Sequence, residues 1–168
     1  IFEMNYTDES SPTNFADCEA IFVDPVGDSV GGSIGDLYLI SKWNDNVKDY
    51  TRLFKYPALD QHLGNYPLKA VSNAVSYNLV TRADIAPDGT RIAVGNYDNA
   101  WFWSRNQNQT IADAFNEGAC PLELQLPAQR ECTQFEALAF TQGGTALLEI
   151  SEKTSCDVVG IHKTIFKK

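Results

Sequence analysis

Short runs of alternating apolar and polar residues, separated by turn residues, occupy almost the whole of this 168-residue chain. Alternation with a period of two places successive side chains on opposite faces of a β-strand, so these runs predict strands. Turn signals such as Pro87-Asp88-Gly89 divide them, because Pro presets φ and Gly accepts positive φ. The expected strands are Ile1–Tyr6, Cys18–Val23, Asp36–Trp43, Tyr50–Tyr56, Leu68–Asn78, Thr81–Ala86, Arg91–Tyr97, Ala100–Ser104, Leu122–Leu126, Gln134–Phe140, Ala146–Ser151 and Val158–Phe166.

One helix interrupts the strands. Thr110 is a good N-cap, Asp113 stands three residues later as in a capping box, and Gly118 can end the segment in the left-handed region. The segment between them, Ile111–Phe115, is short, and we expect it to be a loop helix that adds little to the core.

The strands form a repeating unit: a buried strand, a turn, a second buried strand, a third strand and an edge strand. Asp24, Asp88 and Thr141 mark equivalent points, 64 and 53 residues apart. A four-stranded antiparallel unit of this kind is typical of a β-propeller blade. The sequence therefore predicts an all-β fold with about three blades in a single partial propeller domain. The blades are expected at residues 16–79, 80–127 and 131–168, with residues 1–6 as an edge strand of a closing blade.

A propeller ring usually needs about 4–8 blades, so three blades do not make an ordinary ring. Two explanations remain open. Either further sequence of the same precursor completes the ring, or a second copy of the chain does so. The chain begins at Ile1 and shows no leader segment, so we expect a processed chain or a part of a longer one, and we favour further sequence over a second copy.

These residues resemble the secreted, phytase-like and PD40-type β-propeller families. The resemblance implies a propeller fold, and the phytase-like members imply metal-assisted hydrolysis of phosphate esters. Such families often carry Arg and Thr at the end of a blade's second strand, where this chain has Gly95 and Asn96. Because propellers host many functions, the resemblance does not choose an activity. The segments that carry it are Asp17–Pro25, Gly35–Lys42, Ala83–Val94, Trp103, Phe135–Phe140 and Ser151-Glu152.

Composition narrows the classes of function. The formal net charge is −9, and the basic residues are scattered, whereas a nucleic-acid surface needs a basic stripe. The content of apolar residues is 43%, which argues against disorder. No apolar run approaches the roughly 20 residues of a membrane-spanning helix. We therefore expect protein partners and neither nucleic acid nor a membrane span.

Cysteines and sequons favour an extracellular, secreted protein. The four cysteines have no CxxC pair, so a structural zinc site is not expected. Three disulfide pairings are open; we favour Cys120 with Cys132, the shortest loop, which leaves Cys18 with Cys156. N-x-T sequons at Asn5 and Asn108 are candidate glycosylation sites. An even number of cysteines together with sequons is typical of an oxidising compartment.

Five charged residues are candidates for a site at the mouth of a propeller channel. Glu19 and Glu136 begin the innermost strands, Asp84 is one position out of register with them, and Lys42 and Glu152 end the second strands. Converging carboxylates would suit Ca²⁺ or a phosphate ester. The alternative, which we favour, is that these groups pair with each other and with backbone amides and fix the blades.

Other templates are missing. Only two histidines are present, in unrelated contexts, and there is no G-x-S-x-G, H-E-x-x-H or P-loop motif.

Alternation in Trp101-Phe102-Trp103 places Trp101 and Trp103 on one face and Phe102 on the other, where we expect them to fill the spaces between blades; carbohydrate stacking is the alternative. The favoured function is a non-catalytic extracellular propeller module for structure, assembly or ligand binding, without a cofactor. The alternative is a Ca²⁺-dependent phosphoester hydrolase.

Overall fold

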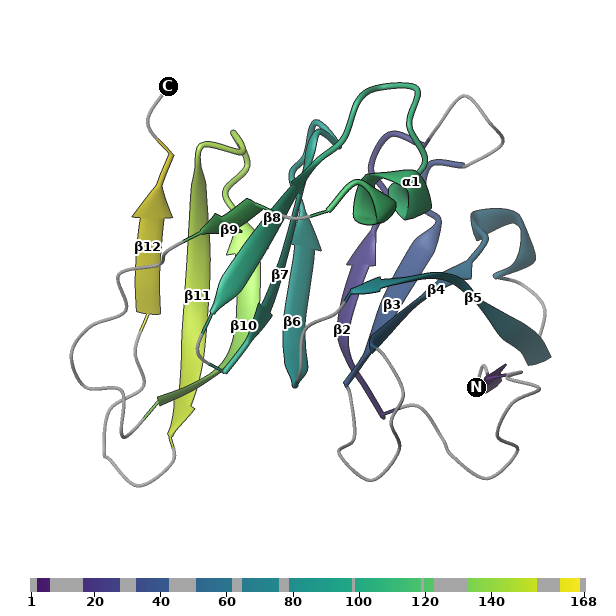
Figure 1. The fold of residues 1–168 in the computed structure, drawn as a ribbon, viewed down its shortest axis with the longest axis horizontal. Coiled ribbons are helices and arrows are strands. Elements are labelled where there is room, and N and C mark those ends of the chain that lie inside the picture. Colours follow the sequence, from purple (N-terminus) through teal and green to yellow (C-terminus); the bar gives the residue numbers. More distant parts are fainter. Residues whose placement is uncertain are drawn as a thin grey trace.

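A computed structural model of the chain describes residues 3–6, 17–27, 33–42, 51–61, 65–75, 79–97, 99–118, 120–122, 133–153 and 161–166. Nearly all of the elements are strands (Figure 1). The elements are β1 (Glu3–Tyr6), β2 (Asp17–Val23), β3 (Leu37–Lys42), β4 (Thr51–Tyr56), the 3-10 turn η1 (Ala58–Asp60), β5 (Asn65–Val75), β6 (Val80–Ile85), β7 (Arg91–Asn96), β8 (Ala100–Ser104), α1 (Ile111–Asn116), β9 (Cys120–Leu122), β10 (Thr133–Phe140), β11 (Ala146–Lys153) and β12 (Ile161–Ile165).

The strands form three sheets. Sheet 1 has the order β1-β5-β4-β3-β2, sheet 2 the order β6-β7-β8-β9 and sheet 3 the order β10-β11-β12. Strands that follow one another within a sheet pair antiparallel, so β2–β5, β6–β9 and β10–β12 are three meanders in chain order. The expected all-β fold is confirmed. The described residues form no closed ring.

The strand at the N-terminus has a partner within its own chain. β1 pairs in parallel with β5, with Glu3 opposite Asn65 and Tyr6 opposite Leu68. Residues 1–6 were expected to extend a closing blade, whereas the described part of this segment extends sheet 1.

Each meander begins with a strand that carries a β-bulge at the same place. The extra residues are Glu19 in β2, Thr81 in β6 and Glu136 in β10. The first strand ends four residues after each bulge, and the next backbone N–H closes the following turn: that of Asp24 donates to Asp36, and that of Ala86 to Arg91. In sheet 3 the N–H of Thr141 donates to Ala146. The expected equivalence of Asp24, Asp88 and Thr141 is therefore wrong by two residues in sheet 2, where the turn signal at Pro87-Asp88-Gly89 begins beyond the equivalent point, Ala86.

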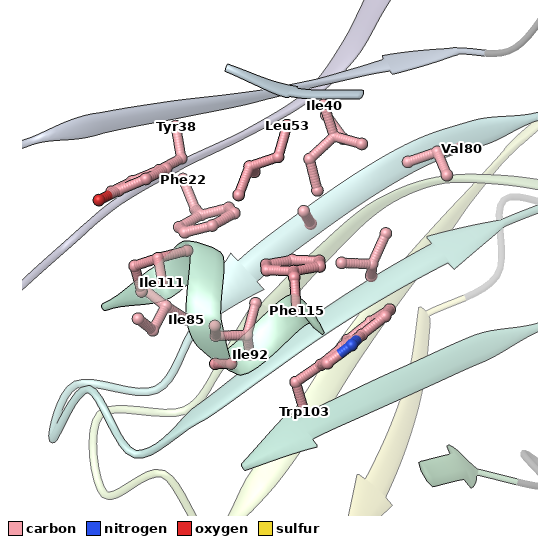
Figure 2. Packing of buried hydrophobic residues seen from close by; sticks show 14 residues of the cluster. Phe22, Tyr38, Ile40, Leu53, Val80, Ile85, Ile92, Trp103, Ile111 and Phe115 are labelled. Carbon is pink, nitrogen blue, oxygen red and sulfur yellow. The ribbon is translucent and has the colours of Figure 1, made fainter. Parts of the chain in front are cut away.

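The three sheets stand side by side, with β6 packed between β2 and β10 (Figure 1). The largest buried cluster lies between sheets 1 and 2, and Figure 2 shows its packing around Phe22, Leu53 and Trp103. A second cluster, with Ala93, Phe140 and Leu147, lies between sheets 2 and 3. Sheet 2 therefore has both of its faces covered, and this is why the strand β6 is buried along nearly its whole length.

The helix α1 contributes to this core. Ile111, Ala114 and Phe115 are buried, and the Phe115 ring lies 4.6 Å from Trp103 between centroids. The N-cap is confirmed, since Thr110 Oγ1 accepts a 3.0 Å hydrogen bond from the Asp113 N–H, and Gly118 has φ +91°. The expected minor role of the helix is wrong, because its apolar side fills the space between sheets 1 and 2.

Candidate functional site

Two of the five charged candidates meet where the first and second strands of sheet 1 come together. The Lys42 ammonium donates to both carboxylate oxygens of Glu19, at 2.7 and 2.8 Å, and to the Tyr97 hydroxyl at 2.7 Å. Tyr97 follows β7, so this cluster joins sheet 1 to sheet 2. Burial alone would lower the pKa of Lys42, but the bonds to Glu19 and Tyr97 outweigh it and raise the pKa well above its usual value.

Asp84 does not stand in register with Glu19 and Glu136. Thr81 occupies their equivalent bulge position, and Asp84 lies three residues farther along β6. Asp84 Oδ2 accepts a 2.7 Å hydrogen bond from the Phe140 N–H of sheet 3. Burial raises the pKa of Asp84 above its usual range, although the Phe140 and Ile85 amides act in the opposite direction. The group is therefore a carboxyl that links two sheets.

The remaining candidates are placed less completely. Glu136 is partly buried at the bulge of β10. Glu152 is paired in β11, but its side chain lies outside the described residues. Among the residues that the structure describes, no three His, Cys, Asp or Glu side chains gather as metal ligands would.

The cysteines and sequons are described only in part. Cys18 is partly buried in β2, whereas Cys132, Cys156 and the side chain of Cys120 lie outside the described residues, as does the side chain of Asn5. Asn108 is exposed in the turn before α1. Both disulfide pairings and both glycosylation sites stay predictions.

Two buried ion pairs between sheets were not expected from the sequence. Arg82 of β6 donates to Glu149 of β11, at 3.1 Å from Nε and 2.8 Å from Nη2, and both side chains are almost fully buried. Arg82 also donates to the carbonyls of Phe135 and Asn96. A signal existed for Glu149, which interrupts the apolar run Ala146–Ile150, and a charge in such a place must find a partner.

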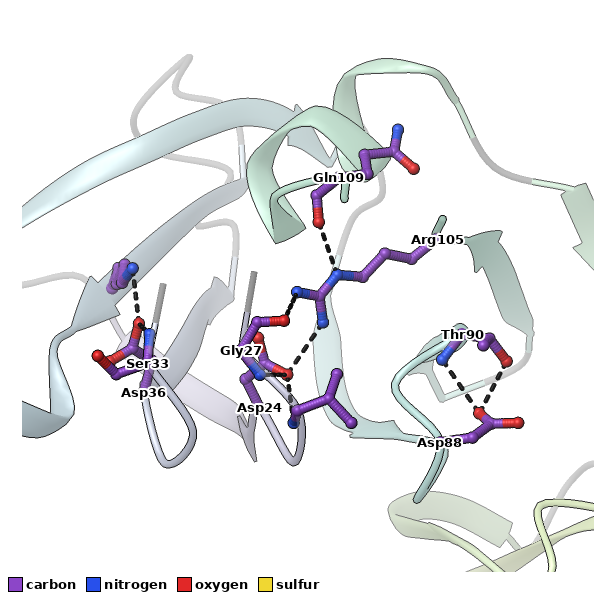
Figure 3. Close-up of polar contacts among 10 residues, drawn as sticks. Asp24, Gly27, Ser33, Asp36, Asp88, Thr90, Arg105 and Gln109 are labelled. Carbon is purple, nitrogen blue, oxygen red and sulfur yellow. Dashed lines mark hydrogen bonds and ion pairs between the residues drawn. The ribbon is translucent and has the colours of Figure 1, made fainter. Parts of the chain in front are cut away.

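The second pair joins the turn after β2 to the segment after β8 (Figure 3). Arg105 Nη1 lies 2.9 Å from Asp24 Oδ1, and both side chains are buried. Nη2 donates to the Gly27 carbonyl and Nε to the Gln109 carbonyl, so every guanidinium nitrogen is bonded to protein. A cavity of about 220 Å³ opens beside this network, between Val26, Thr90 and Arg105. Because its guanidinium is held by protein oxygens, the network acts as a clamp between sheets.

The three sheets pack in the same orientation, so that the same kind of face always meets the opposite kind in the next sheet. The two faces are defined by the positions of residues after the bulge in each first strand. We call the side with residues two and four after the bulge face A, and the side with residues one and three face B. Face B of sheet 1 (Ala20, Phe22) packs on face A of sheet 2 (Ala83, Ile85). Face B of sheet 2 contacts sheet 3 through Arg82 and Asp84, and face A of sheet 3 supplies Leu138 and Phe140.

Among the described residues, this order leaves face A of sheet 1 and face B of sheet 3 without a partner sheet, and each carries exposed apolar side chains. On face A of sheet 1, Ile21 is 53% exposed and Val23 50% exposed, although Leu39 and Phe54 farther across the sheet are buried. On face B of sheet 3, cross-strand pairing places Ala137, Ile150 and Ile161 in one row, and Ala139, Leu148 and Lys163 in the next. Ile150 is 43% exposed, Ile161 71% and Ile165 67%. These open apolar faces are the candidate functional surface.

The tryptophans are placed as predicted. Trp103, with Trp101 packed against it, belongs to the cluster between sheets 1 and 2, and Phe102 to the cluster between sheets 2 and 3. Trp103 is almost fully buried, so it offers no stacking surface for a carbohydrate.

No protein-family model matches this chain, and no curated protein matches it significantly. Among the described residues no helix has the length and apolar character needed to cross a bilayer.

Proposed function

We propose that this chain is a non-catalytic module of an extracellular β-propeller, whose role is to assemble with further sheets. The observation that carries the proposal is the pair of open apolar faces at the two ends of a stack with uniform polarity. Three antiparallel meanders with neighbouring first strands are the arrangement that successive propeller blades adopt. Exposed contiguous apolar surface on a folded protein is typical of an interaction site.

Three ion pairs, one formed by two of the charged candidates and two not expected from the sequence, support the same proposal. Lys42 with Glu19, Arg82 with Glu149 and Arg105 with Asp24 all take part in contacts that hold sheets to one another. Removing one partner of a buried pair is strongly destabilising, whereas the pair itself adds specificity of arrangement. These groups therefore fix how one sheet meets the next.

The assembly role is tested by the binding of an apolar fluorescent dye, anilinonaphthalene sulfonate, to the chain at a dilution at which it is monomeric. The open faces should bind the dye, and Ile150→Lys together with Ile161→Lys should reduce the fluorescence without lowering the melting temperature, because both side chains are exposed. Ile34→Lys is the matched control, since Ile34 is 70% exposed in the turn between β2 and β3. A dye signal that is absent in the monomeric wild-type chain would show covered faces and refute the proposal.

Ca²⁺-assisted phosphoester hydrolysis is the second candidate. The raised pKa of Asp84 favours it, because a carboxyl whose pKa is raised by burial is better suited than an ordinary one to give up a proton as a general acid. Measured phosphatase activity with Ca²⁺ should be absent from the wild-type chain under the first proposal. Activity that Glu19→Gln and Glu136→Gln abolish, with the circular dichroism spectrum unchanged, would replace the first proposal with the second.

A further inference from the structure

We infer that the partner of the open faces is a second copy of this chain, joined head to tail, so that face B of sheet 3 in one copy packs on face A of sheet 1 in the other. The inference rests on the proposed assembly function and names its partner. It adds that the two open faces are different from each other and complementary.

The contacts within the chain support this arrangement. Face B meets face A at both internal junctions, from sheet 1 to sheet 2 and from sheet 2 to sheet 3. Continuing the same order past sheet 3 requires a sheet with an open face A. Sheet 1 of this chain offers such a face along its first strand, β2, where Ile21 and Val23 are about half exposed, whereas Leu39 and Phe54 farther across the same face are already covered.

The side chains on the two faces fit in size and polarity. The first strand of sheet 3 presents the small residues Ala137 and Ala139, and β2 presents the larger Ile21 and Val23. The junction between sheets 1 and 2 likewise sets small residues, Ala20 and Ala83, beside large ones. The first strands would thus meet without burying a charge, which favours association.

Two junctions form at once when two copies pair in this way. Sheet 3 of each copy packs on sheet 1 of the other copy, so a twofold axis relates the two junctions. The pair contains twice the three sheets of one chain, which falls within the range of about 4–8 blades in propeller rings. The closed pair leaves no apolar end face exposed.

A heterodimer experiment tests the polarity. Wild-type chain, Ile150→Lys, Ile21→Glu and the control Ile34→Lys are studied separately by sedimentation equilibrium over a dilution series. The wild type and the control should have about twice the 18.6 kDa mass of the chain. Each of the other two variants should raise the dimer dissociation constant about 30-fold or more, because it places charges in an apolar contact.

Mixing Ile150→Lys with Ile21→Glu should then restore dimers, because one junction is wild type and the other pairs Lys with Glu. A face-to-face pair would be disturbed by only one of the two substitutions, and that result would overturn the inference. A folded wild-type monomer would also overturn it. If that monomer still binds the apolar dye, the assembly proposal stands and the faces receive other sheets; if it does not, both proposals fail.

Discussion

Gly95 of β7 lies opposite Arg82 in the antiparallel pair of β6 and β7. A β carbon added to Gly95 would stand 2.7 Å from both Cζ and Nε of Arg82. The absence of a side chain at this position therefore makes room for the guanidinium that reaches Glu149.

Gly95→Ala should displace the Arg82 guanidinium and break its pair with Glu149. We expect the free energy of unfolding to fall by about 3 kcal/mol, because a buried charge is left without its partner. Urea denaturation measures the change. Gly143→Ala is the control, since its added β carbon would come no closer than 3.8 Å to a neighbouring atom. Equal losses in the two variants would contradict the role of Gly95.

Two aspartates, Asp84 between sheets 2 and 3 and Asp36 beside β3 of sheet 1, should respond to pH in opposite directions. Burial raises the pKa of Asp84. Burial also acts to raise the pKa of Asp36, but the Lys55 ion pair at 2.6 Å and the N–H groups of Ala58 and Ser33 outweigh it and lower the pKa. Asp36 thus contributes stability above its usual pKa, which is lost as the pH falls, whereas ionised Asp84 costs stability at neutral pH.

Asp84→Asn should raise the melting temperature by a few degrees at about pH 7, because the amide oxygen can still accept from Phe140 without carrying a charge. The gain should shrink as the pH falls through the raised pKa of Asp84, where the wild-type carboxyl binds its proton. Asp36→Asn should lower the melting temperature at about pH 7, with a loss that also shrinks on acidification. Circular dichroism melts from about pH 2.5 to pH 7 check both signs, because the contribution of Asp36 is lost only below its ordinary pKa of about 4. A pH-independent gain in Asp84→Asn would contradict the assignment.

Among the elements, α1 departs most from what the sequence suggested. Six residues are too few for a helix to be stable by itself, so its order depends on packing. Phe115 is completely buried, and its ring lies against Trp103 within the largest cluster (Figure 2). A short helix can therefore be part of the core when two sheets diverge around it.

Phe115→Ala should lower the free energy of unfolding by about 3–5 kcal/mol, the usual cost of deleting a buried aromatic ring. Glu117→Ala, an exposed position directly after the helix, should change it by less than about 0.5 kcal/mol. Chemical denaturation of the two variants compares them. Similar small effects at both positions would restore the sequence-based view of a loop helix.

The strands could be predicted because their period-two pattern is local, and the N-cap at Thr110 because capping needs only neighbouring residues. The positions that are equivalent in the three sheets, and the side chains that pair across them, could not be predicted. Asp84 was placed near Glu19 and Glu136 because a bulge leaves no mark in the sequence, and Thr81 occupies the equivalent position. The partners of Arg82 and Arg105 lie 67 and 81 residues away along the chain, so only the stacking reveals them.

At the scale of the whole molecule, the expected secretion of the protein can be tested at Asn108, the sequon residue that lies on the described surface. This residue is exposed in the turn that precedes α1, the helix whose buried side packs between sheets 1 and 2. A glycan at this position would leave both faces accessible. The sequon and the assembly proposal are therefore compatible.

Expression through a secretory pathway should attach an N-linked glycan at Asn108. Intact mass measurement before and after treatment with an endoglycosidase should show the glycan, and Asn108→Gln should remove it. The Asn108→Gln chain should retain the oligomeric state of the wild type. An unmodified Asn108 in secreted protein would count against the extracellular assignment.

The different chemistry of successive B faces has a consequence for the order of synthesis. When only sheets 1 and 2 have been made, the last face of the nascent chain presents Arg82 and Asp84, and an apolar face A from a neighbouring chain is a poor partner for these charges. Once sheet 3 is complete, Glu149 pairs with Arg82, and the terminal face becomes apolar. In the proposed assembly, a chain would therefore become competent to associate only with its last sheet, and the exposed charges of a chain interrupted earlier would disfavour its association.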